Sequence, residues 1–395
     1  MIEFPAGFAC HVANVGIKDD TDDLVVITTD RPRPSVGRFT KSRFAGPSVT
    51  LSRDHLSDGL AQAVVIISKN ANVANGPAGD DDAREVVAQT AQRLGCADRD
   101  VLIASTGVIG RRYPMDRISS GLAAVPGQLN EIAAQSNTSS PASLLDAARG
   151  IMTTDTAPKM AEATIGDGPA RVVGIAKGVG MIEPDMATLI TVLLTDADIE
   201  AEILSPIADD VIDRTFNSIS IDTDTSTSDT AVIMTSAASG LVDPDQFAAA
   251  LFDVARSLAR QIAADGEGAE TLIEVTVDGG RDRAQAKRVA KSIVNSPLVK
   301  TAVHGRDPNW GRVAMAIGKC SDDTDIDPDN VVIRFGTTEV YPRPIDDAAL
   351  SSLAEYLHNE EVLIHVSLGI ADGTATVWGC DLTDGYVRIN ADYTT

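Results

Sequence analysis

Apolar residues recur along the chain in two spacings, one typical of strands and one typical of helices. Short apolar runs, rich in β-branched residues and bounded by polar or turn residues, predict buried strands. These runs are 63–67, 101–104, 172–175, 189–194, 231–234, 272–277, 331–335, 362–368 and 375–378. Apolar positions three or four residues apart instead predict amphipathic helices. These stretches are 83–94, 206–216, 246–264, 285–293 and 346–356.

The order of these elements favours an α+β fold. The predicted strands outnumber the helices and do not alternate with them one for one. A doubly wound parallel sheet would require such an alternation, so we expect layered sheets with helices outside them.

Composition narrows the class of protein. The chain has 395 residues, 44% of them hydrophobic, and a formal net charge of −24. This length can bury a sizeable core, and a strongly acidic chain repels phosphate backbones, so nucleic acid is not an expected partner. The apolar runs are shorter than a membrane span and the N-terminal residues lack a signal-peptide pattern. We therefore expect a cytoplasmic protein without a membrane partner.

The sequence contains no pattern typical of a metal or cofactor site. The four cysteines form no C-x-x-C pair, and none of the five histidines is paired at ligand spacing. Phosphate-binding glycine motifs are also absent. We therefore expect neither a metal nor a cofactor.

Residues 176–189 join a glycine-rich loop containing Lys177 to an apolar strand that Thr188 precedes. From the residues alone this is an ordinary loop-to-strand junction or a latent catalytic site. A chain break before Thr188 would place its hydroxyl beside its own α-amine, which can act as the base. Such a nucleophile needs no histidine.

Three further segments are candidates for the same chemistry. Thr106 and Gly107 follow a predicted strand, where a hydroxyl and a glycine N–H can bind one oxyanion. The segment 151–156 is rich in hydroxyl groups, and Glu267 lies between two glycines after a predicted helix. Each of these segments is also compatible with a plain turn.

Together the segments resemble the ornithine acetyltransferase family, the glutamate N-acetyltransferases of cyclic arginine biosynthesis. The resemblance extends from Gly7 to Thr395, and the motifs follow the order of the family. They are S-T-G-V-I-G-R at 105–111, I-M-T-T-D-T at 151–156, A-K-G-V-G-M-I-E-P-D-M-A-T-L at 176–189, D-T-S-T-S-D at 224–229, D-G-E-G-A at 265–269 and D-P-N-W-G-R at 307–312. Residues 182–185 read I-E-P-D where many members read I-H-P-N, which resembles the paralogue of clavulanic-acid producers.

The resemblance implies an α-β-β-α sandwich, similar to N-terminal-nucleophile hydrolases but with distinct connectivity. It also implies self-cleavage between Ala187 and Thr188, giving an α chain of residues 1–187 and a β chain of residues 188–395. The two chains are expected to assemble as an (αβ)2 heterotetramer.

By the same resemblance, Thr188 is the nucleophile, and Thr106 and Gly107 form the oxyanion pair. The positions matching substrate contacts are Thr153, Lys177, Thr188, Glu267, Asn390 and Thr395. The choice of Thr153 over Thr154 rests on motif position alone.

The expected reaction is a ping-pong transfer of an acetyl group from N2-acetyl-L-ornithine to L-glutamate through acetyl-Thr188. The alternatives are an N-terminal-nucleophile amidase or aminopeptidase, an acyltransferase of a clavulanic-acid-type pathway, and an acidic binding protein without activity.

Overall fold

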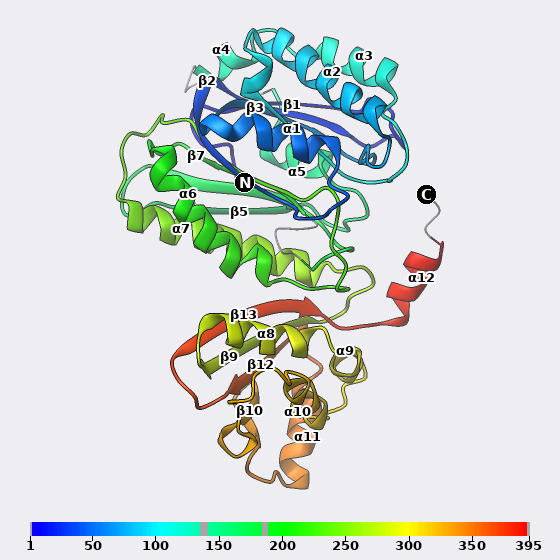
Figure 1. Cartoon of the computed structure of the whole chain (residues 1–395), viewed down its shortest axis with the longest axis vertical. Helices are drawn as coiled ribbons and strands as arrows, with labels where there is room; N and C mark the ends of the chain where they lie inside the picture. Colours follow the sequence, from blue (N-terminus) through cyan, green and yellow to red (C-terminus); the bar gives the residue numbers. More distant parts are fainter. Residues whose placement is uncertain (1, 135–140, 184–188, 393–395) are drawn as a thin grey trace.

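The computed structural model describes residues 2–134, 141–183 and 189–392. A two-sheet sandwich forms the larger part of the molecule, and a smaller sheet with its own helices lies beyond a narrow waist (Figure 1). Among the described residues, no helix combines the length and apolar character needed to cross a membrane.

A long bent strand connects the two layers of the sandwich. Strand β2 (Leu24–Phe39) pairs through its first half with β1 (Ala9–Ala13) and β3 (Leu60–Ile67). Strand β4 (Val101–Ser105) extends this layer in parallel with β3. The last residues of β2 pair instead with β8 in the second layer.

The second layer continues through β8 (Thr230–Thr235), β7 (Ile190–Thr195), β6 (Arg171–Lys177) and β5 (Lys159–Thr164). Only β7 and β8 are parallel among these neighbours; β6 is antiparallel to both β5 and β7. Because β2 belongs to both layers, the full strand order is β4-β3-β2-β8-β7-β6-β5.

Helices cover the outer face of each layer. The first layer is covered by α2 (Pro77–Leu94), α3 (Met115–Ala124) and α4 (Leu129–Ala134), with α1 (Pro47–His55) beside β4. The second layer is covered by α6 (Ala201–Arg214) and α7 (Pro244–Ala264). A third apolar core, to which α5 (Leu144–Gly150) contributes, fills the space between the sheets. These layers confirm the expected α-β-β-α sandwich.

The smaller unit has a five-stranded sheet in the order β11-β10-β12-β9-β13 and an apolar core of its own. Its strands are β9 (Leu272–Gly280), β10 (Val332–Phe335), β11 (Thr338–Tyr341), β12 (Glu361–Ser367) and β13 (Gly373–Cys380). Its helices are α8 (Arg283–Val294), α9 (Pro297–His304), α10 (Gly311–Gly318) and α11 (Asp347–Tyr356). From β13 the chain returns toward the sandwich, and α12 (Asp384–Asp392) projects from one side of the waist (Figure 1).

The predicted strands and helices are present, but two of the helices begin well before their predicted starts. The helix predicted over 83–94 begins at Pro77, so its predicted start was wrong. The helix predicted over 206–216 begins at Ala201 and encloses Pro206. Buried Leu204 extends the apolar stripe of this helix to a point before the proline, so the predicted start at 206 was wrong.

Candidate active site

The ends of strands from both layers of the sandwich meet at Lys177. This residue ends β6, is only 7% exposed, and donates from Nζ to Thr106 Oγ1 at 3.3 Å. Thr106 directly follows β4 in the other layer. Burial lowers the pKa of Lys177 from its ordinary value, although the nearby charge of Asp155 works in the opposite direction.

Asp155 fixes the backbone immediately after Lys177. Its Oδ1 accepts from the Gly178 N–H at 2.7 Å and from Lys159 Nζ at 2.8 Å. Its Oδ2 accepts from the Thr153 N–H at 3.1 Å. Burial opposes ionisation of Asp155, but the positive charges of Lys177 and Lys159 hold its pKa below the ordinary value.

Lys159 connects Asp155 to the segment that contains Glu267. Its ammonium also donates to Asp265 Oδ2 at 2.6 Å, so it lies between two carboxylates. The side chains of Lys159, Asp155 and Asp265 are only 2%, 0% and 13% exposed. Neither Asp155 nor Lys159 is among the site residues predicted from the sequence. For Asp155 the available signal was a charged residue inside the hydroxyl-rich 151–156 motif.

Glu267 lies where three segments meet. Its Oε1 accepts from Thr154 Oγ1 at 3.2 Å, and its Oε2 accepts from Asn390 Nδ2 of α12 at 2.9 Å. Its backbone N–H donates to the Val179 carbonyl at 2.8 Å. A Cβ at Gly180 would lie 2.5 Å from Glu267 Oε2, so a larger residue at position 180 would displace this carboxylate. The hydroxyl that contacts Glu267 thus belongs to Thr154, and substrate contact by Thr153 stays a prediction.

Gly107 is required by the backbone that packs against it. Its φ is +125°, and a Cβ would lie 2.2 Å from the carbonyl carbon of Lys69 and 2.6 Å from the Asn70 nitrogen. The preceding residue is also fixed, because the Thr106 N–H donates to the Ile67 carbonyl at 3.1 Å. No other residue fits here without moving one of the two loops.

Asp229 is a buried carboxyl that the sequence analysis did not single out. It is 3% exposed and lies at the end of the D-T-S-T-S-D motif. Burial raises its pKa well above the ordinary value. The next residue, Thr230, donates its N–H to the Leu189 carbonyl at 2.9 Å, so Asp229 lies beside the start of β7.

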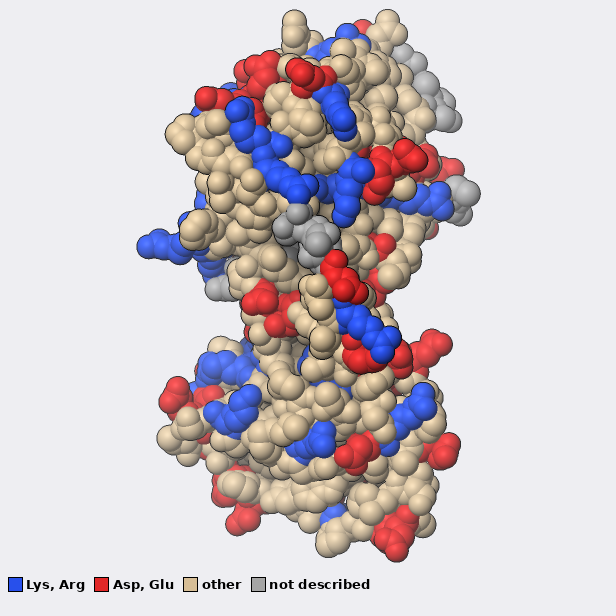
Figure 2. All heavy atoms as spheres, turned by 90° about the vertical axis from the view of Figure 1, so that its right-hand side faces the viewer, with Lys and Arg blue, Asp and Glu red and all other residues tan. Residues whose placement is uncertain are grey.

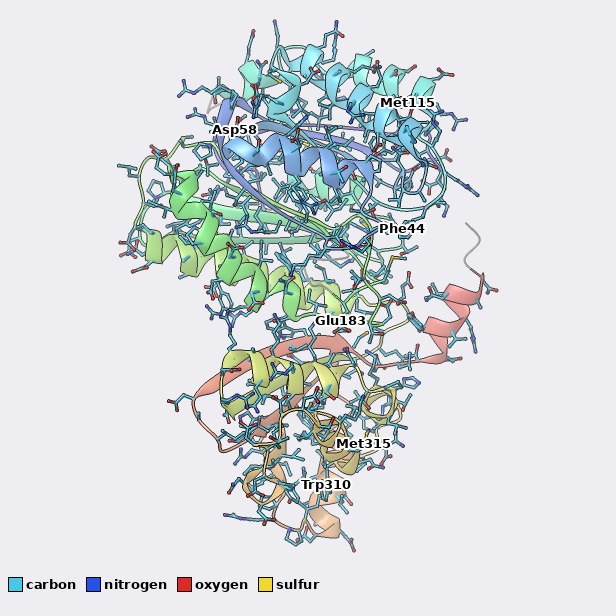
Figure 3. All side chains as sticks on the ribbon, in the orientation of Figure 1. Phe44, Asp58, Met115, Glu183, Trp310 and Met315 are labelled. Atoms are coloured by element: carbon cyan, nitrogen blue, oxygen red, sulfur yellow. The ribbon has the colours of Figure 1, made fainter. Side chains whose placement is uncertain are left out.

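The segment after β6 is also held by the smaller unit. Glu183 lies at the waist (Figure 3), where its Oε2 accepts from Asn295 Nδ2 at 2.8 Å. Its Oε1 lies 3.3 Å from Nζ of Lys291 in α8, the helix that Asn295 directly follows. Glu183 is one of the two positions at which this chain departs from the I-H-P-N pattern. Its carboxylate has three partners here, because Ser220 Oγ also donates to Oε2 at 3.3 Å.

The side of the molecule that carries α12 presents a band of Lys and Arg side chains across the sandwich (Figure 2). Because Asn390 of α12 contacts Glu267, the candidate site lies on the side from which α12 projects (Figure 1).

The structure brings together Thr106, Lys177, Glu267 and Asn390, and their roles in the reaction stay predictions. Ala187, Thr188 and Thr395 lie outside the described residues, so their roles stay predictions.

Comparison with known proteins identifies the family. Residues 9–395 match the model described as the ArgJ family. The chain belongs to the ArgJ family. This membership confirms the resemblance to ornithine acetyltransferases found in the sequence.

Two relatives of this ArgJ-family chain match over nearly its whole length. The Arginine biosynthesis bifunctional protein ArgJ 2 of Nostoc sp. is 55% identical over 391 residues, which cover 99% of this chain and 98% of the relative. The Glutamate N-acetyltransferase Oat2 of Streptomyces clavuligerus is 54% identical over 397 residues, with the same coverage of 99% and 98%. A crystal structure of the Arginine biosynthesis bifunctional protein argJ from Bacillus halodurans is 40% identical, with a TM-score of 0.48; the match covers 51% of this chain and 98% of that one.

Proposed function

We propose that this chain is a self-processing glutamate N-acetyltransferase of arginine biosynthesis. It moves the acetyl group of N2-acetyl-L-ornithine to L-glutamate. The observation that carries the proposal is the meeting of Lys177, Thr106 and Glu267 beside the segment that leads to Thr188, in a chain of the ArgJ family.

The first half of the reaction forms an acyl-enzyme. The Thr188 hydroxyl loses its proton to the α-amine of the same residue and attacks the acetyl carbonyl. Thr106 and the Gly107 N–H donate to the resulting oxyanion. When this intermediate collapses, the C–N bond breaks, ornithine leaves with a proton, and the acetyl group remains on Thr188.

The second half regenerates the enzyme. The amine of glutamate attacks the acetyl-Thr188 carbonyl, and collapse breaks the ester bond and returns the proton to the Thr188 oxygen. Lys177 is suited to pair with a substrate carboxylate and Glu267 with the substrate ammonium. The scheme requires no cofactor and no metal.

The same threonine starts the proposed self-cleavage after Ala187. The two products, residues 1–187 and 188–395, would contribute neighbouring strands to one sheet, with Lys177 paired to Ile190. We further propose that the products assemble as a cytoplasmic (αβ)2 heterotetramer.

An acetyl-transfer assay tests the activity. Wild-type protein is incubated with N2-acetyl-L-ornithine labelled in the acetyl group, with and without glutamate. The expected result is labelled N-acetylglutamate that depends on glutamate. Release of the label as acetate at the same rate without glutamate would instead support an amidase.

A denaturing gel tests the processing. Division of 41.4 kDa in proportion to length predicts fragments of about 20 and about 22 kDa, the larger beginning Thr-Leu-Ile-Thr. Thr188→Ala is expected to remain a single band, because it lacks the hydroxyl that starts the acyl shift. Active wild-type protein that runs as one full-length band would contradict self-cleavage.

A further inference from the structure

Three asparagines, Asn70, Asn72 and Asn75, follow β3, and two of them bond to the loop that carries Thr106 and Gly107. Asn70 Nδ2 donates to the Arg112 carbonyl at 3.0 Å, and Asn75 Nδ2 donates to the Arg111 carbonyl at 2.9 Å. These two bonds fix adjacent carbonyls at the end of the oxyanion loop, which we define as residues 106–112.

Asn72 links the other two asparagines. Its N–H donates to Asn70 Oδ1 at 2.8 Å, and its Oδ1 accepts from Asn75 Nδ2 at 2.9 Å. Its own Nδ2 donates to the Gly79 carbonyl in the first turn of α2 at 2.8 Å. Asn70 and Asn72 are only 5% and 1% exposed. The bond from Asn72 to Gly79 therefore attaches the network to α2 in the interior of the protein.

Backbone hydrogen bonds join the same two loops. The Val108 N–H donates to the Lys69 carbonyl at 3.3 Å, and the Ala71 N–H donates to the Val108 carbonyl at 3.0 Å. The Gly110 N–H donates to the Val73 carbonyl at 2.9 Å. Together with the close approach of Lys69 to Gly107, these bonds leave the oxyanion loop little freedom to move toward β3.

The loop that carries the three asparagines, residues 69–75, contains several non-glycine residues with a positive φ angle. Lys69, Asn72 and Ala74 have φ values of 71°, 51° and 62°. Non-glycine residues with positive φ are uncommon, and such conformations persist where surrounding contacts determine them. The side-chain network of Asn70, Asn72 and Asn75 supplies such contacts.

We propose that Asn70, Asn72 and Asn75 form a clamp that positions Thr106 and Gly107 for oxyanion binding. They are positioning residues: Asn70 and Asn75 bond to the oxyanion loop, Asn72 holds those two side chains, and none of these bonds goes to the reacting atoms. Donors stabilise an oxyanion when they lie about 2.7–3.1 Å from it, so a small shift of this loop lowers the rate. The inference rests on the proposed function and adds residues that act through its oxyanion pair.

The test is a double-mutant cycle between the clamp and the oxyanion pair. Asn75→Ala is the first variant, because Asn75 is half-buried and its truncation leaves no large cavity. We expect kcat for acetyl transfer to fall about 10-fold while KM stays within about 2-fold, since the loss occurs in the transition state. In a Thr106→Ala background the same change is expected to lower kcat by less than about 3-fold, because the two residues act as one unit.

Two further variants complete the test. Asn72→Asp keeps the acceptor for Asn75 but loses the donor to Gly79, so it is expected to lower kcat in the same coupled manner. Asn359→Ala, an exposed asparagine of the smaller unit, is the matched control and is expected to retain wild-type kcat.

The outcomes separate the clamp from the proposed function. Equal kcat losses from Asn75→Ala in both backgrounds, or a rise in KM alone, would overturn the clamp and leave the oxyanion pair in place. If Thr106→Ala itself leaves kcat unchanged, the oxyanion role in the proposed function is wrong, and the clamp is overturned with it.

Discussion

Replacing Lys159 by methionine removes the positive charge from a buried three-residue network. The Lys159 ammonium lies 2.8 Å from Asp155 Oδ1 and 2.6 Å from Asp265 Oδ2. Methionine fills a similar volume but leaves both carboxylates without this cation. Removing one partner of a buried ion pair typically costs about 3–5 kcal/mol, because a buried charge is left uncompensated.

This loss of stability corresponds to a fall in Tm that calorimetry can measure. An unfolding entropy of about 2.1 cal/mol/K per residue gives about 0.8 kcal/mol/K for 395 residues that unfold together. The expected fall in Tm at pH 7 is therefore about 4–6 °C. Lys319→Met, an exposed lysine in the loop after α10, is the control and is expected to change Tm by less than about 1 °C.

The Tm difference between wild type and Lys159→Met is also expected to depend on pH. Lys177 and Lys159 hold the pKa of Asp155 below its unfolded value despite burial, so the stability from its ionisation is present above about pH 4. It is lost as the pH falls through the folded-state pKa. Without Lys159 that pKa rises, so the Tm difference between wild type and Lys159→Met is expected to narrow from pH 7 to pH 4. A Tm at pH 7 within 1 °C of the Lys319→Met control would refute the reasoning.

Three further predictions concern catalysis. Thr106→Ala removes one oxyanion donor and is expected to lower kcat by about 10²- to 10³-fold in steady-state acetyl transfer; an unchanged kcat would exclude Thr106 from the mechanism. Glu267→Gln is expected to lower kcat/KM for N-acetylornithine about 10- to 150-fold, and far less for a neutral acyl donor without the amine; equal losses would mean that Glu267 does not bind the ammonium. Burial lowers the pKa of Lys177, so its charge is lost as the pH rises, and Lys177→Arg is expected to move the alkaline limb of kcat/KM to higher pH; a limb that stays in place would show that Lys177 does not set it.

Local patterning predicts the sandwich strands but not the strand that joins its layers. Runs such as 63–67 and 101–104 are buried in β3 and β4 because neither face of the layer is exposed to water. Strand β2 gives a weaker signal, because residues 29–35 carry charged residues and prolines where it bends between the layers. Its assignment needs the pairing partners β3 and β8, which lie far away in the sequence.

The sequence likewise predicts some residues of the candidate site and not others. Thr106, Lys177 and Glu267 lie in short motifs that resemble those of the ornithine acetyltransferase family, and the resemblance implies their roles. Lys159 carries no such signal, since a lone lysine at a strand start is typical of a solvent-exposed residue. Its role depends on Asp265, which lies 106 positions further along the chain and approaches it only in the folded sandwich.

The sheet topology explains how a chain of this kind could be cut beside its active site and remain assembled. The proposed cleavage position lies between β6 and β7, which pair antiparallel from Val172 with Thr195 to Lys177 with Ile190. Residues on both sides of the cut also share the core between the layers and the core under α6 and α7. Loss of one peptide bond removes none of these contacts. We therefore expect the two products to copurify under native conditions and to separate only in denaturant, whereas separation in native buffer would contradict this account.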